Sequence, residues 1–149
     1  GPRGEILMAR FLTKSDEQGV LEALREAETN TSGEIRVHLQ PRCKGDPMEA
    51  AKKRFERLKM TQTEKRNGVL FFVSTRDQKL AVLGDKGIDD ATPPDFWESI
   101  VTAVTDCFRE GRIPDGLCEG IRMAGKALQA YFPYQSDDVN ELTDEISYA

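Results

Sequence analysis

The sequence predicts a three-layer α/β/α sandwich with a mixed sheet of three to five strands and about four main helices. Three observations predict it. Residues 69–73 are apolar without interruption, which is typical of a central strand covered on both faces. A helical segment at residues 46–58 separates this strand from an earlier one at 34–40, as in a parallel β-α-β unit. Only residues 75–78 separate it from a third strand, which must therefore be its antiparallel neighbour.

The first half of the chain begins with an amphipathic helix. Ser15 opens a Ser-Asp-Glu-Gln capping box, so the helix is expected from there to about Asn30. Residues 34–40 alternate apolar and polar side chains, which is typical of a strand covered on one face. The second helix is expected to start with Asp46 as N-cap and Pro47 at its first helical position.

The second half of the chain holds two further helices after the hairpin. The Thr-Pro-Pro sequence of residues 92–94 is expected to open the third helix, and Gly111 to end it. Pro114 is expected to open the fourth helix, and Pro133 stops it. No repeat or second-domain linker interrupts this order.

The chain is expected to form one domain with two appendages. Residues 1–9 form an N-terminal extension, part of which resembles the remnant of a cleaved tag. Residues 10–134 form the domain, and 149 residues suffice to bury one core. Residues 135–149 are an acidic tail with five acids and no base, expected to be extended and without a fixed position.

Composition excludes several classes of protein. The net charge is −5 and no basic stripe is interleaved with aromatics, so nucleic acid is not an expected partner. The three cysteines lack the CxxC spacing of a zinc site, and their odd number argues against a disulfide framework. No apolar run is long enough for a membrane helix or a signal peptide. We therefore expect a cytoplasmic monomer with no membrane segment.

Strand direction predicts a cluster of polar residues at one end of the sheet. The two parallel strands start near Glu34 and Asn67, and the antiparallel strand ends next to Asp85. Carboxylates on loops, with carbonyl oxygens of residues 86–88 between them, suit calcium or, less well, magnesium. The predicted metal ligands are Glu34, Asp85, Asp89 and Asp90.

A metal-free alternative and a phosphate site that acts together with the metal remain open. In the segment GDKGIDD, which is not an EF-hand loop, Asp85 and Asp89 can instead shape turns, and Asp90 or Thr92 can cap the third helix. Arg66 and Asn67 form a predicted anion site, where a phosphate ester could bind next to a helix N-terminus. Hydrolysis there would depend on metal-activated water, because no nucleophile is evident. His38 is expected to be a satisfied strand histidine and not a catalytic one.

Several segments, in this order, resemble the TPM-domain family, which includes thylakoid acid-phosphatase-like proteins and short soluble bacterial proteins. They are SGEIRVHL, RNGVLFFVS, VLGDKGI, CFREG and GLCEGIRMAGKAL. The resemblance covers about residues 15–132. It implies an α/β/α sandwich with an acidic cleft linked to divalent metal, calcium in particular, and weak acid phosphatase activity in plant members. It places Glu34 and Asp85 in that cleft, with Arg66 close by.

Three functions follow from these observations. The first is a calcium-binding domain with an acidic cleft and a regulatory or protein-interaction role. The second is a low-turnover, metal-dependent acid phosphatase that acts on phosphate monoesters. The third is a structural adaptor without metal. We place the first ahead, because the acids are present and a nucleophile is not.

Overall fold

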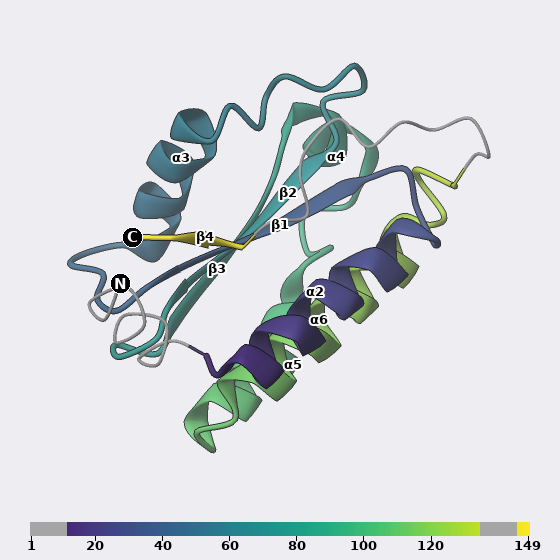
Figure 1. Ribbon diagram of the computed structural model, residues 1–149. Helices are drawn as coiled ribbons and strands as arrows, with labels where there is room; N and C mark the ends of the chain where they lie inside the picture. The colour runs from purple at the N-terminus through teal and green to yellow at the C-terminus, as the bar shows by residue number, and fades with distance from the viewer. Residues whose placement is uncertain (1–11, 135–145) are drawn as a thin grey trace.

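The computed structural model describes residues 12–134 and 146–149, and these form three layers (Figure 1). One face of the sheet is covered by α3 (Pro47–Arg57). The other face is covered by α2 (Lys14–Glu28), α5 (Glu98–Arg109) and α6 (Ile113–Leu128). A short helix, α4 (Lys86–Ala91), lies at one end of the sheet. The predicted α/β sandwich is confirmed.

The sheet has the order β3-β2-β1-β4 and mixes parallel and antiparallel pairs. β1 (Glu34–Gln40) runs parallel to β2 (Gly68–Ser74), and Glu34 lies opposite Gly68. β3 (Lys79–Gly84) runs antiparallel to β2, with Gly84 opposite Val69. The parallel unit followed by a hairpin is therefore as predicted.

The central strand β2 is buried along its whole length, as its apolar run predicts. Its side chains alternate between two cores. Val69, Phe71 and Val73 pack in the larger cluster beneath α2, α5 and α6. Leu70 and Phe72 pack in the smaller cluster beneath α3. An inner strand with both faces dry holds the residues at its two ends in fixed positions.

Of the predicted N-caps of the first two helices, one is confirmed and one is wrong. Asp46 caps α3 by accepting a hydrogen bond from the Met48 N–H at 3.0 Å, as predicted. The prediction of Ser15 as the first cap is wrong, because α2 begins at Lys14 and Thr13 Oγ1 accepts from the Asp16 N–H at 3.0 Å. Thr13 and Ser15 both have a capping side chain, and the earlier one lengthens the helix.

The predicted start of the third helix is also wrong. The segment before Pro93 already forms α4, capped by Asp85, and α5 begins only at Glu98 after a turn. α4 is anchored by Ile88, which is fully buried in the larger core. The expected end at Gly111 is confirmed, since this glycine has a φ of 76° directly after the last turn of α5.

The last residues of the chain join the sheet. β4 (Ser147–Tyr148) pairs parallel with His38 and Leu39 of β1, and Tyr148 packs against the larger core. The expectation of a tail without a fixed position is therefore wrong for residues 146–149. The tail's five acids, at residues 135–145, and the N-terminal extension lie outside the described residues.

Within the two described ranges, none of the helices has both the length and the apolar character needed to span a bilayer.

Candidate functional site

Two chain segments cross at the end of the sheet where β2 begins and β3 ends. We call residues 63–67 and 85–90 together the loop crossing. Gly87 lies at its centre, where its N–H donates to the Arg66 carbonyl oxygen at 2.9 Å. A methyl group on Gly87 would come within 2.1 Å of the Lys65 carbonyl oxygen. Only glycine permits this approach of two backbones.

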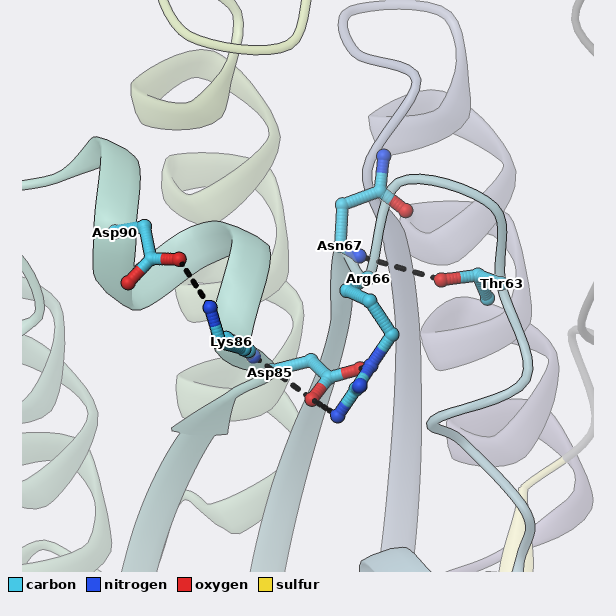
Figure 2. Close-up of polar contacts among 6 residues, drawn as sticks. All are labelled: Thr63, Arg66, Asn67, Asp85, Lys86 and Asp90. Atoms are coloured by element: carbon cyan, nitrogen blue, oxygen red, sulfur yellow. Dashed lines mark hydrogen bonds and ion pairs between the residues drawn. The ribbon is translucent and has the colours of Figure 1, made fainter.

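Asp85 joins the two segments through its carboxylate (Figure 2). Arg66 Nε donates to Asp85 Oδ2 at 2.6 Å, and Arg66 Nη2 donates to Oδ1 at 2.8 Å. Such a two-point pair fixes orientation as well as distance. The Asp85 side chain is only 5% exposed, whereas that of Arg66 is 44% exposed. The hydrogen bond to Asp85 raises the pKa of Arg66 above its usual range.

Asp85 also begins α4. Its Oδ1 accepts from the Lys86 N–H at 2.8 Å, so the same carboxylate pairs with Arg66 and caps a helix. Arg66 itself has a φ of 50°, in the left-handed region that costs free energy for any residue other than glycine. The two-point pair with Asp85 offsets this cost. Asp85 was expected only to shape a turn, and it caps α4 instead. The expected capping of the third helix by Asp90 or Thr92 is wrong, because the N-cap position of α5 is Trp97.

Asn67 connects the crossing to β1. Its side-chain Nδ2 donates to the Ser32 carbonyl oxygen at 3.2 Å, and its own carbonyl oxygen accepts from the Glu34 N–H at 3.1 Å. Its backbone N–H donates to Thr63 Oγ1 at 3.3 Å (Figure 2). Glu34 is buried at the start of β1. The structure therefore brings Glu34, Arg66, Asn67 and Asp85 to one end of the sheet, as strand direction predicts.

Asp89 and Asp90 lie on α4 and are exposed. Lys86 Nζ donates to Asp90 Oδ2 at 3.0 Å (Figure 2). The pKa of Asp89 is raised, first by partial burial and then by the negative charges of Asp90 and Asp85. The Asp89 carboxylate thus lies in the negative field of its two neighbours, and a cation beside it would relieve that repulsion.

The carbonyl oxygens of residues 86–88, expected between the carboxylates, belong to a helix in the structure. Residues 86–88 are helical, and the Ile88 carbonyl oxygen accepts from the Thr92 N–H at 3.0 Å and from Thr92 Oγ1 at 2.8 Å. At the crossing the carbonyl oxygens next to Gly87 belong to Lys65 and Arg66, and that of Arg66 already accepts from the Gly87 N–H. Sequence patterns could not identify these two carbonyl oxygens, because their residues lie nineteen or more positions before α4. The available signal was Gly87, a glycine close to a capping aspartate.

The donor set agrees with the preferences of a hard cation. Calcium takes six to eight oxygen ligands from carboxylates, carbonyls and water, and both protein types are present at the crossing. Across residues 12–134 and 146–149, no three His, Cys, Asp or Glu side chains converge closely enough to hold a metal ion. A cation here would therefore depend on carbonyl oxygens and water in addition to the acids.

His38 lies in the second half of β1, away from the crossing. It is fully buried, with Nδ1 at 2.9 Å from Ser147 Oγ and Nε2 at 3.0 Å from Gln40 Oε1. Its ring stacks on Phe72 at a centroid distance of 5.4 Å. Burial lowers the pKa of His38 to about 4, so it is neutral near pH 7. It is the satisfied strand histidine that the sequence predicts.

The chain is similar to known proteins over most of its length. The family model described as TPM domain matches residues 7–127. The chain is 43% identical to the BA42 protein of the psychrophilic bacterium Bizionia argentinensis; the match covers 93% of this chain and 95% of that structure, with a TM-score of 0.88.

Two more distant structures share the fold. The N-terminal domain of a protein from P. gingivalis is 18% identical, with a TM-score of 0.67 over 83% of this chain and 80% of that one. The N-terminal domain of the cg2496 protein from Corynebacterium glutamicum is 10% identical, with a TM-score of 0.62 over 91% and 79%. No curated protein matches the chain.

Proposed function

This chain belongs to the TPM domain family, and we propose that it is a divalent-cation-binding domain, for calcium ahead of magnesium, with a regulatory role in engaging another protein. The observation that supports this proposal is the loop crossing itself. There, a segment with three carboxylates, Asp85, Asp89 and Asp90, lies against the backbone carbonyl oxygens of residues 65 and 66. A cytoplasmic location in a bacterium belongs to the same proposal.

The residues of the crossing divide into two roles. Asp85 is already neutralised by Arg66, so its charge is not available while that pair is closed. Asp89 is exposed and provides negative charge that attracts a cation. Asp90 is paired with Lys86, but both side chains are exposed, so that pair can open at low cost and free the Asp90 carboxylate. Carbonyl oxygens of the opposing segment and water would complete the coordination. Glu34, buried behind Asn67, stays a predicted ligand at the same end of the sheet.

Cation binding at the crossing offers a means of regulation. The two segments are joined by one backbone hydrogen bond at Gly87 and by the Arg66–Asp85 pair. A cation held by both segments would stabilise their contact by mass action. The position of α4, and of the residues that follow it, would then depend on calcium concentration.

The test is calorimetric titration of the chain with calcium and magnesium. We expect calcium to bind more tightly, and the double variant Asp89→Asn/Asp90→Asn to weaken calcium binding at least about tenfold, since two direct ligands lose their charge. The control is Asp106→Asn/Asp115→Asn, which removes the same charge from exposed positions on α5 and α6. Equal weakening by both variants, or no heat from either cation at millimolar concentration, would contradict the proposal.

The pH of the titration provides a second readout. Because the pKa of Asp89 is raised, protons compete with the cation at a higher pH than for an ordinary aspartate. We expect calcium affinity to fall as the pH is lowered through that range. The Asp89→Asn variant should lose this part of the pH dependence and keep the rest.

The phosphatase alternative ranks second. Arg66 is the cation that would meet a phosphoryl oxygen, and it is half-exposed at the crossing. Its guanidinium is bonded at two points to Asp85, so a phosphate ester would first have to displace that carboxylate. Calcium-dependent release of phosphate from a generic monoester, lost in Arg66→Gln, would favour this alternative. The metal-free adaptor is favoured if neither cation binds.

A further inference from the structure

A groove runs along the outer edge of the sheet, beside β3 and apart from the residues of the loop crossing. Its volume is about 540 Å³. β3 forms its floor, α3 contributes one wall, and α5 with the turn before it contributes the other. The residues that define it are Leu80, Ala81, Val82, Met48, Trp97 and Val101. The groove therefore straddles the sheet edge, and both helical layers flank it.

The floor of this groove is a strand with one open side. In the described part of the chain, β3 pairs with β2 and with no other strand. The Asp85 N–H donates to the Gly68 carbonyl oxygen at 2.9 Å, and hydrogen-bonded pairs alternate along an antiparallel ladder. Counted from that pair, Ala81 and Leu83 direct their backbone groups toward β2. Leu80 and Val82 direct theirs outward, into the groove.

The chemistry of the walls is apolar. Leu80, Trp97 and Val101 are partly buried against the larger core and present their remaining surface to the groove. Met48 is partly buried against the smaller core on the other side. An added strand would direct alternate side chains toward these two walls. Sites for extended peptides combine backbone hydrogen bonds on a sheet edge with such side-chain pockets.

The rim of the groove is acidic. Asp95 and Glu98 line the groove, and both also line an adjoining hollow of about 590 Å³ together with Asp106. Of the residues that the structure describes, no lysine or arginine lines either space, although Arg109 lies 3.8 Å from Asp106. Complementary charge selects the sign of a partner and speeds its association. The rim therefore favours a basic partner.

From these observations we infer that the β3 edge receives, as an added strand, an extended peptide segment of a partner protein that is apolar at its centre and carries lysine or arginine at its ends. Apolar side chains at every second central position enter between Trp97 and Val82. Basic side chains at an end of the segment lie beside Asp95 and Glu98, on the same side of the groove. The inference rests on the protein-interaction part of the proposed function and names the class of partner. It does not depend on a cation.

The probe is a capped decapeptide with three valine-threonine repeats at its centre and two lysines at each end, added to the full chain in EDTA. Trp97 is the only tryptophan of the chain, so its fluorescence reports binding at the groove. We expect saturable binding with shifts of the backbone amide signals of residues 80–82. The same decapeptide with glutamate in place of lysine should not bind. The lysine-ended decapeptide N-methylated at alternate residues should lose binding, because it cannot form the ladder.

Protein variants separate groove binding from general attraction to an acidic chain. Asp95→Lys/Glu98→Lys should weaken peptide binding at least about fivefold, as expected for two solvent-exposed ion pairs replaced by like charges. Glu22→Lys/Glu119→Lys, which changes the net charge equally at exposed positions on α2 and α6, should not. Equal effects of the two variants overturn the inference. Equal binding of the N-methylated peptide overturns the inference as well. So does a dimer in sedimentation that forms through the groove, because a second copy of the chain would then occupy it.

The outcome is independent of the cation proposal. Peptide binding in EDTA supports the peptide site at the groove even if calcium never binds. Calcium binding without any peptide-induced change in Trp97 fluorescence supports the cation proposal and overturns the inference about the groove. The two failures are therefore distinguishable in one set of samples.

Discussion

The two ends of the sheet hold their polar groups in opposite ways. At the loop crossing the groups are charged and partly exposed, and Arg66 and Asp85 neutralise each other. Around His38 the groups are neutral and buried, and each ring nitrogen has one partner. The Asp85 carboxylate is only 5% exposed and therefore needs a positive partner, which Arg66, 44% exposed, provides from the solvent side. A buried neutral network, by contrast, resists any change of charge. This difference supports the proposal that ligands exchange at the crossing, and it indicates a structural role for the His38 end.

The largest expected effect is a loss of stability on acidification, caused by the buried His38. The folded pKa is about 4 and the reference value is 6.5, so the unfolded chain takes up a proton between these pH values and the folded chain does not. The contribution of neutral His38 to the free energy of unfolding is fully present above pH 6.5 and is lost as the pH falls from 6.5 to 4. Below pH 4 the loss does not grow further. The loss at pH 4 is about 3 kcal/mol. Urea unfolding at pH 7 and pH 4 should show it.

The control for this loss is His38→Gln, which cannot titrate. The stability gap between the wild type and the variant should narrow by about 3 kcal/mol between pH 7 and pH 4, while the carboxylates affect both proteins alike. A gap that does not change with pH would mean that His38 is not held neutral by burial.

A methyl group at Gly87 should force apart the two segments of the loop crossing. Gly87→Ala places a carbon 2.1 Å from the Lys65 carbonyl oxygen and 2.7 Å from that of Arg66, so the two segments must separate. We expect a loss of about 1–3 kcal/mol, the usual cost of overpacking, together with loss of calcium binding. Thermal unfolding with and without calcium measures both.

The matched control is Gly19→Ala in α2, where the nearest atom to the added methyl group is Cys118 Sγ at 3.9 Å. This change should be neutral or slightly stabilising, because alanine favours helix. If Gly87→Ala behaves in the same way, the close approach of the two segments has no energetic importance.

Removal of residues 146–149 gives the smallest expected effect. It deletes β4, the hydrogen bond from the Ala149 N–H to the Leu39 carbonyl oxygen, and the bond from Tyr148 Oη to Glu17. We expect a loss of about 1–2 kcal/mol, since a few hydrogen bonds and one partly buried tyrosine are involved. Melting temperature measures it, and calcium affinity should stay unchanged. A change in calcium affinity would show that the two ends are coupled.

The sequence predicted the features that follow from pattern and direction. The apolar run at 69–73 identified the central strand, and the directions of three strands placed Arg66 and Asp85 together. It did not predict α4, because six residues are too few for a helical period, and Asp85 served equally well as a loop acid. Nor did it predict β4, whose two residues carry no periodic signal.

The carbonyl oxygens at the crossing were beyond any sequence pattern. Every residue has such an oxygen, and only the contact between residues 65–66 and Gly87 distinguishes those that gather there. The same holds for the groove beside β3, which depends on the distance between α3 and α5 across the sheet edge.

Calcium titration followed by backbone amide NMR signals tests the central claim most directly. The cation proposal predicts saturable shifts confined to residues 63–67 and 85–91, while the signals of His38 and β4 stay in place. Loss of these shifts in Asp89→Asn/Asp90→Asn, and not in Asp106→Asn/Asp115→Asn, would show that calcium binds at the acids of α4. Absence of any shift at millimolar calcium, or shifts centred on the His38 end, would contradict the assignment of cation binding to the crossing.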